Sequence, residues 1–258
     1  MSAEPTRVVP GLLVLVRTEL LKLNTTRAPW LLAGVALALT VLLALQPVTR
    51  SGRDGAPSIG TVGAALGVLD ALGRGTLVAL LVGVLVVTGE FRHQTVGTSL
   101  LQTPNRIQLV VAKSAASSLV GMALGMSSLI LVLAIGAASG ALPLELVNSN
   151  IAIRVLGLVL TYPLYALLGA AVGALLNRTQ PLAVILPIAW LVAIEGLVTS
   201  ALPQEATPWS IGGVTAALQH AGNLPYVLPV WVGGGALLSY ALLLLAAATL
   251  HLNRTDIT

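Results

Sequence analysis

The residues of this chain that could contact a partner are concentrated in one polar stretch between two long apolar runs. It begins Gly-Glu-Phe-Arg-His-Gln-Thr at Gly89 and continues through two leucines, a proline and an arginine to Lys113. Only 9% of all residues are charged, so charge gathered in one short segment indicates a loop that meets water and another protein. The 89–113 segment is therefore the first candidate for function.

Ionisable residues within or beside the apolar runs are the second candidates, because charge inside a bilayer is costly and usually functional. Asp70 and Arg74 are four residues apart, which places them on one helix face and lets them pair. They form either a self-neutralising pair or a polar patch on an export route. Glu195 has no basic residue within one turn. It would protonate, pair with Arg154 or Arg74, or line an aqueous cavity.

The sequence lacks the patterns of several other chemistries. The only lysines, Lys22 and Lys113, do not follow the glycines that a phosphate-binding loop requires, so ATP would be hydrolysed by another chain. The histidines at 93, 220 and 251 lie in different loops or tails, which excludes a histidine metal cluster within one helix. Cysteine is absent. We therefore expect no catalytic residue, metal site or cofactor in this chain.

The composition indicates an integral membrane protein. Hydrophobic residues make up 56% of the chain and the mean hydropathy is +0.95, far from the values of soluble domains. The net charge of +4 would suggest nucleic acid in a soluble protein. Here the basic residues are scattered between apolar blocks, so they are better explained by orientation in the membrane. Nucleic acid is not expected as a partner.

Six apolar windows are long enough to cross a bilayer of about 30 Å as helices of roughly 20 residues. They lie near 28–45, 67–88, 114–138, 151–176, 181–202 and 229–250. With the amino terminus in the cytoplasm, nine of the thirteen basic residues fall on the cytoplasmic side, as the positive-inside rule requires. The expected fold is an all-α integral membrane protein, with residues 1–258 in one domain and both termini cytoplasmic.

Two segments outside the spans have helical character of their own. Residues 9–27 predict an amphipathic helix in the cytoplasmic headgroup layer, with Val9, Leu12, Leu13, Val16, Leu20 and Leu23 on its apolar face. It either supplies charge for topology or contributes to coupling. Residues 203–228 are half polar and predict one or two short outer helices between the fifth and sixth spans.

This arrangement resembles the permease subunits of the ABC-2 type transporter family. The family loop commonly reads Gly-Glu-aromatic-Arg, then Thr, Leu-Leu, Pro-x-Arg and Lys at the start of the third span. The matching residues here are Gly89, Glu90, Phe91, Arg92, Thr95, Leu100, Leu101, Pro104, Arg106 and Lys113. The resemblance covers the whole chain in architecture, but its specific residues lie in this one loop.

The resemblance implies that the loop is a coupling helix that docks on a separate ATP-binding subunit. Its contact residues would be Glu90, Phe91, Arg92, Thr95, Pro104, Arg106 and Lys113, with Arg17 and Lys22 of the amino-terminal helix. The loop is also tied to two spans at once, as a force-transmitting element must be. The alternative is that these charges only set topology.

The function that follows is a permease of an ATP-driven exporter in the bacterial cytoplasmic membrane. It would act as a dimer with a second permease copy and two ATP-binding subunits, which would hold ATP and Mg²⁺. Because little charge is available to line a pathway, a hydrophobic or amphipathic substrate such as a drug, a lipid-like molecule or a peptide antibiotic is expected. The alternative is a non-transporting membrane sensor, scaffold or immunity protein.

Overall fold

The computed structural model describes residues 11–53, 55–92, 106–142, 149–176, 179–219 and 228–254, and it does not describe the side chains of 90–92, 106, 149, 150, 180 and 252–254. Every regular element within these ranges is a helix. The elements are α1 (Leu12–Thr25), α2 (Arg27–Thr49), α3 (Val62–Arg74), α4 (Thr76–Arg92), α6 (Arg106–Ala138), α7 (Ser149–Leu175), α8 (Gln180–Ala189), the π-helix η2 (Trp190–Ile194), α9 (Glu195–Ala201), the 3₁₀-helix η3 (Thr207–Trp209), α10 (Ile211–Gln219) and α11 (Val230–Arg254).

Six helical segments are long and apolar enough to cross a membrane, which confirms the number predicted from the sequence. They are Arg27–Thr49, Val62–Gly89, Ile107–Ala138, Ile151–Leu175, Pro181–Ala201 and Val230–His251. A helix satisfies its backbone hydrogen bonds internally, which is what hydrocarbon demands of a spanning segment. The chain is therefore a multi-pass, all-helical membrane protein.

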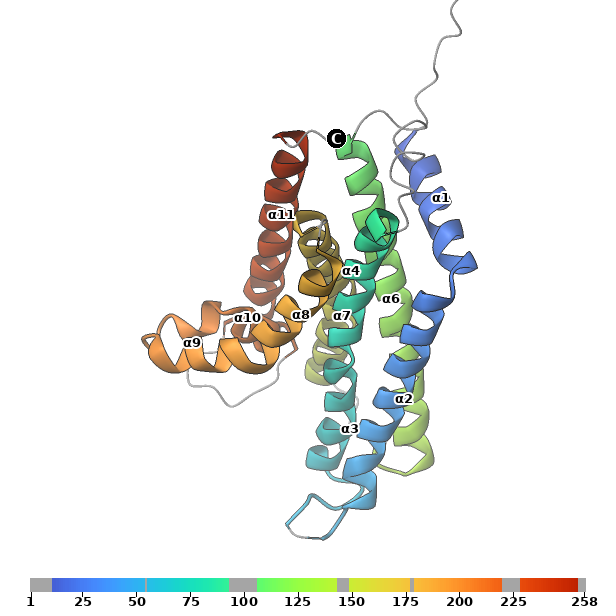
Figure 1. The fold of residues 1–258 in the computed structure, drawn as a ribbon. Helices are drawn as coiled ribbons and strands as arrows, with labels where there is room; N and C mark the ends of the chain where they lie inside the picture. The colour runs from blue at the N-terminus through green and yellow to red at the C-terminus, as the bar shows by residue number, and fades with distance from the viewer. Residues whose placement is uncertain are drawn as a thin grey trace, which may run out of the picture.

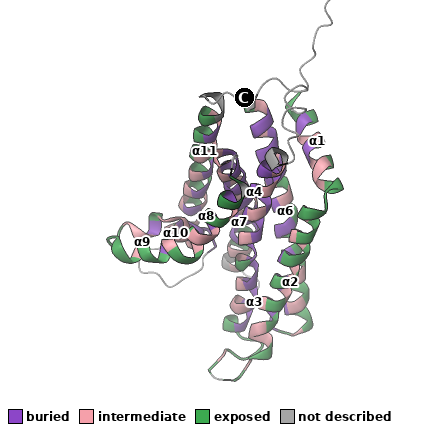
Figure 2. Cartoon of the chain, viewed as in Figure 1, coloured by how far each residue is buried: buried purple, intermediate pink, exposed green. Residues whose placement is uncertain are grey.

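Helix α7 is the centre of the bundle. Figure 1 shows α4 in front of it, α6 and α2 on one side and α11 on the other, and α7 packs most extensively against α4, α6 and α11. Burial agrees with this central position of α7. Figure 2 shows buried residues mainly on α4 and α7, whereas α2 and α9 carry much of the exposed surface. The fourth span thus sits in the protein interior, and α2, α9 and α11 form the periphery.

Glycine lets the neighbours of α7 approach its backbone. A Cβ atom on Gly83 of α4 would lie closer than 3.0 Å to the carbonyl oxygen of Ala166, and one on Gly169 of α7 would crowd Leu80 in the same way. A Cβ atom on Gly121 of α6 would crowd the carbonyl oxygen of Tyr162, and one on Gly157 of α7 would crowd that of Leu218 on α10. Small residues at helix crossings permit this close packing in membranes. Gly121, Gly157 and Gly169 therefore serve contacts within one chain.

The second span is two helices rather than one, because the helix breaks at Gly75 between α3 and α4. The break exposes backbone carbonyls that need donors. The hydroxyl of Tyr162 donates to the carbonyl of Leu72 at 2.8 Å, and the hydroxyl of Thr76 donates to that of Gly73 at 2.7 Å. A side chain at Gly75 would collide with Tyr162. The break is thus a packed, hydrogen-bonded feature of the core.

The fifth span is bent. It runs from α8 through the π-helix η2 into α9, and Pro187 lies three residues before η2. Proline cannot donate to the helix ladder, and a π-turn adds a residue to it; both are recognised causes of helix bending. In Figure 1, α8 and α9 turn away from the long helices and lie across them. Within the fifth span, α8 makes the main packing against α7.

The segment between the fifth and sixth spans contains the short helices expected there, η3 and α10. Helix α10 packs against both α11 and α7. Two hydroxyl contacts fix this region: Tyr165 on α7 bonds Thr215 of α10 at 3.0 Å, and Tyr240 on α11 donates to the carbonyl of Trp209 at 2.8 Å. The short helices are therefore part of the bundle rather than a loose loop.

Candidate functional site

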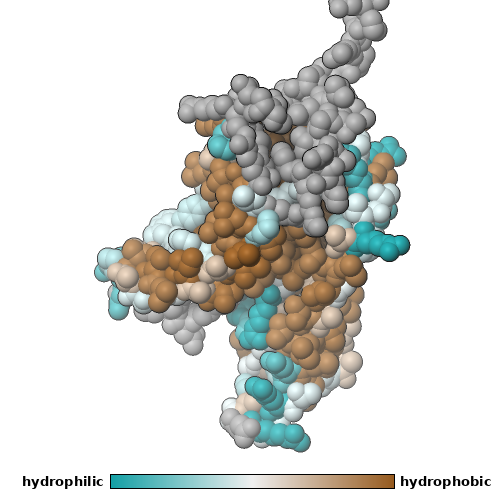
Figure 3. Space-filling view, in the orientation of Figure 1, coloured by the Kyte–Doolittle hydropathy of each residue, from teal (hydrophilic) through white to brown (hydrophobic). Residues whose placement is uncertain are grey.

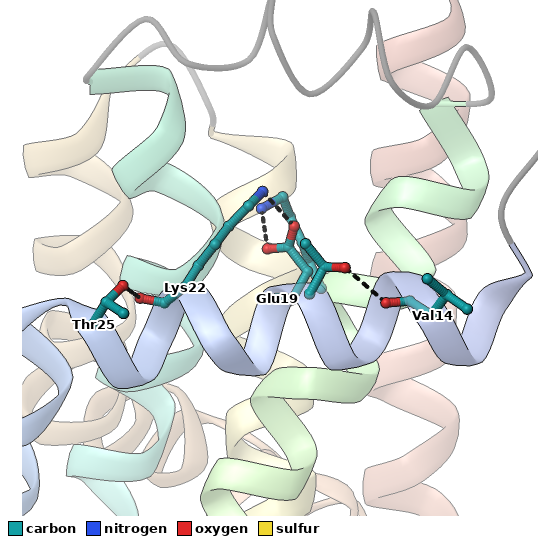
Figure 4. Close-up of polar contacts among 6 residues, drawn as sticks. Val14, Glu19, Lys22 and Thr25 are labelled. Carbon is teal, nitrogen blue, oxygen red and sulfur yellow. Dashed lines mark hydrogen bonds and ion pairs between the residues drawn. The ribbon is translucent and has the colours of Figure 1, made fainter.

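A buried ion pair joins the amino-terminal helix to the third span. The carboxylate of Glu19 on α1 binds the ammonium of Lys113 on α6 at 2.6 Å and that of Lys22 at 2.8 Å. Glu19 and Lys113 are only 4% and 3% exposed. Figure 4 shows Glu19 and Lys22 side by side on α1, with their charged ends meeting above the helix. A charge pair this deeply buried is a fixed contact, so α1 and the start of α6 are linked.

The predicted amino-terminal helix is present as α1, and its position in the headgroup layer stays a prediction. Leu12 and Leu13 of the predicted apolar face do not pack against the protein and are 43% and 84% exposed, as side chains that face lipid would be. The packed face is instead the one that carries Leu15 and Glu19. Glu19 falls on that face because its charge is neutralised by Lys113, a residue 94 positions away that periodicity in α1 cannot reveal.

The polar loop lies mostly outside the described residues. Thr95 and Pro104 belong to 93–105, which the structure does not describe, so a coupling helix there stays a prediction. Glu90, Phe91 and Arg92 form the last turn of α4.

On the far side of the loop, Arg106 is the first residue of α6, and Lys113 lies two turns further into the same helix. Residues 93–105 thus lie in the sequence between the end of α4 and the start of α6, and their role in coupling stays a prediction. Of the basic residues predicted on α1, Arg17 is exposed, and the side chain of Lys22 is 42% exposed in its pair with Glu19.

The structure pairs Asp70 with a residue that the sequence interpretation placed elsewhere. The guanidinium of Arg154 on α7 donates to the carboxylate of Asp70 on α3. The side chain of Arg154 is 13% exposed and that of Asp70 is 40% exposed. Arg74, the residue four positions on from Asp70, ends α3 and is exposed. Asp70 thus crosslinks α3 to α7 through Arg154 in place of the predicted pairing with Arg74.

Glu195 fixes the start of α10. It is 8% exposed, and its carboxylate accepts a hydrogen bond from the backbone amide of Gly212. Helix amino termini have unsatisfied amide groups and attract negative charge. This capping contact was not among the expected roles of Glu195, because its partner is a backbone group that no side-chain pattern announces.

An apolar cavity of about 350 Å³ lies beside the bend of the fifth span. It is lined by residues of α4, α7, α8, η2, α10 and α11, together with one residue just after α7: Leu80, Tyr165, Leu168, Val172, Leu175, Leu176, Leu186, Pro187, Trp190, Leu191, Ile211 and Leu244. Figure 3 shows apolar surface over much of this middle region of the molecule. The cavity was not predicted from the sequence. Pro187 and Trp190 marked an unusual helix, but not what it encloses.

Metal ligands are not gathered in the part of the chain that the structure describes. Within it, no three His, Asp or Glu side chains lie together as a metal site would need. The expectation that the chain itself holds no metal or cofactor remains an expectation.

Comparisons with known proteins do not add to this picture. No protein-family model matches the chain, and no curated protein matches it. The resemblance to ABC-2 permeases therefore rests on the loop residues and the architecture described above.

Proposed function

We propose that this chain is the transmembrane permease subunit of an ATP-driven exporter in the bacterial cytoplasmic membrane. A separate ATP-binding subunit, present in two copies, would hold ATP and Mg²⁺, and a second copy of the permease would complete the pathway. The termini and the 89–113 segment would face the cytoplasm. The substrate would be hydrophobic or amphipathic.

The observation that carries this proposal is the ion pair between Glu19 and Lys113. It joins α1 to α6 two turns after α6 leaves the polar loop. The same loop continues from the end of α4. A force applied at this end of the bundle would therefore reach α1, α4 and α6 together, and through α4 it would reach the central helix α7.

The mechanism follows from these connections. Closure of the ATP-binding subunits would push on the 89–113 segment and on α1. Because α4 packs tightly against α7 through Gly83 and Gly169, the push would shift these two spans as one body. The more loosely held fifth span would move relative to them, and substrate would leave toward the outer side.

Co-purification from native membranes tests the proposal. The tagged chain is extracted in mild detergent and the proteins recovered with it are identified by mass spectrometry. We expect a P-loop ATPase in roughly stoichiometric amount, and we expect the double substitution Glu90→Ala and Arg92→Ala to remove it. The control replaces Arg50 and Arg53, which are placed on the opposite side, and should retain the ATPase.

Failure to recover any ATPase with the folded chain would contradict the exporter and would favour a membrane sensor, scaffold or immunity protein. Recovery that is unchanged in the Glu90 and Arg92 variant would instead locate the contact elsewhere.

A further inference from the structure

We propose that the cavity beside the bent fifth span binds a single hydrocarbon chain of an amphipathic molecule. The role of this cavity as a substrate site rests on the proposed function. The binding itself requires no ATPase.

The lining has the chemistry of a hydrocarbon site. Its innermost residues, Leu80, Tyr165 and Leu168, are 1%, 4% and 5% exposed, whereas Leu186 and Trp190 at the rim are 44% and 37% exposed. None of the lining residues carries a charge. The one hydroxyl, on Tyr165, already bonds Thr215 at 3.0 Å. The indole N–H of Trp190 at the rim is the other side-chain donor in the lining, so a polar ligand would find few partners and an apolar chain would need none.

The size of the cavity also suits a chain rather than a whole lipid. Its volume of about 350 Å³ lies near the lower end of the range of roughly 300–1,000 Å³ for small-molecule sites. An apolar cavity does not hold water well, because water finds no hydrogen-bond partner there. An unfilled one forfeits dispersion contacts on every wall. The membrane around the protein supplies hydrocarbon chains as the natural occupant, with the polar end of the molecule left outside the rim.

The bend forms part of the wall of this cavity. Leu186 and Pro187 lie just before the π-helix, and Trp190 and Leu191 are its first two residues. Any straightening of the fifth span would move these four side chains relative to α4 and α7. Glu195 holds the other end of the bend to Gly212 of α10. Occupancy of the cavity is therefore coupled to the shape of the fifth span.

Photolabelling in phosphatidylcholine nanodiscs tests this site. The probe is a fourteen-carbon fatty acid with a diazirine near the end of its chain, and the labelled residues are mapped by mass spectrometry. We expect saturable labelling of the lining of α7, α8, η2 and α11. Leu168→Trp and Leu244→Trp should reduce it at least fivefold by filling the cavity. Leu243→Trp is the matched control, since Leu243 is 68% exposed and its larger side chain leaves the cavity open.

Two results would overturn the proposal. One is labelling that rises linearly with probe and spreads over the exposed helices, and the other is labelling that is unchanged in both tryptophan variants. Thermal unfolding of each variant identifies misfolding. If Leu168→Trp does not fold, the variant at the half-buried Leu244 decides. Saturable labelling without a co-purified ATPase would support the binding site and contradict the exporter. A co-purified ATPase without saturable labelling would support the exporter and contradict the binding site.

Discussion

Glu19 places a carboxylate where little water can reach it, and two lysines hold it there. Removing a charge from water costs several kcal/mol per ion, which a close opposite charge offsets only when the geometry is good. The distance of 2.6 Å between Glu19 and Lys113 meets that condition. A pair of this kind adds little net stability over an apolar pair, but it strongly opposes the loss of one partner. It therefore fixes which face of α1 meets α6.

Replacing Lys113 alone should lower the unfolding free energy much more than replacing Glu19 and Lys113 together. Lys113→Met leaves Glu19 buried against α6 with only Lys22 beside it, and we expect a loss of about 3 kcal/mol in unfolding free energy. The double variant Glu19→Gln and Lys113→Met should recover most of this loss. Reversible unfolding in detergent, analysed as a double-mutant cycle, measures the coupling. Additive effects of the two substitutions would contradict the buried pair.

Glu195 should tolerate loss of its charge better than loss of its oxygen. Glu195→Ala leaves the amide of Gly212 without this acceptor, and we expect a destabilisation of about 1–3 kcal/mol. Glu195→Gln keeps an acceptor oxygen and should cost less. Unfolding midpoints of the two variants in one detergent make the comparison. If Gln were as damaging as Ala, the negative charge itself would be the essential property, as a pathway role would require.

The α4–α7 crossing shows how one element organises the others. Gly83 on α4 and Gly169 on α7 each meet a carbonyl of the opposite helix, so the two backbones are in direct contact. Such a crossing leaves no room for side chains between the helices, and it restricts relative sliding. By contrast, α9 packs chiefly against its own continuation through η2. The second and fourth spans are thus the most tightly packed part of the bundle, and the fifth span packs less extensively against the other helices.

Two glycine-to-alanine substitutions separate this packing from the general effect of glycine in helices. In Gly83→Ala, the new methyl group overlaps the carbonyl of Ala166, and overpacking of this kind costs about 1–3 kcal/mol. Gly34 on α2 has nothing within 4 Å of its Cβ position, so Gly34→Ala should leave the melting temperature unchanged or slightly raised. Equal melting temperatures for both variants would argue against a tight α4–α7 crossing.

At the scale of the whole molecule, one end of the bundle gathers the elements that the proposed function needs. Figure 1 shows the beginning of α1, the end of α4, the beginning of α6 and the end of α11 at the same end. The turn between α2 and α3 lies at the other end. This arrangement agrees with an even number of crossings, because the ends of α4 and α6 that flank residues 93–105 lie at the same end as the beginning of α1 and the end of α11.

Cysteine labelling tests that arrangement without background, because the chain has no cysteine. Ser58→Cys lies in the exposed turn after α2, and Thr258→Cys lies at the carboxyl terminus. In intact cells, a membrane-impermeant maleimide should label position 58 and leave position 258 unlabelled. Inverted vesicles should give the opposite result. Labelling of both positions from one side would contradict six crossings.

The sequence alone determined the number of spans and the helical class, because both follow from length and apolarity of continuous segments. It also indicated the short helices between the fifth and sixth spans. Bilayer thickness and backbone hydrogen bonding leave an apolar run of about 20 residues few alternatives to a spanning helix. These are local properties, and each segment carries its own evidence.

Only the tertiary structure decided which side chains on different helices pair with one another. Glu19 and Lys113 are 94 positions apart, and Asp70 and Arg154 are 84 apart. The spacing within each helix was compatible with other pairings, such as Asp70 with Arg74. The same holds for the cap of Glu195 on Gly212 and for the apolar cavity, whose walls come from α4, α7, α8, η2, α10 and α11. Which faces meet depends on how whole helices pack, and the close approaches at glycine that settle this packing are fixed only when all the helices are in place.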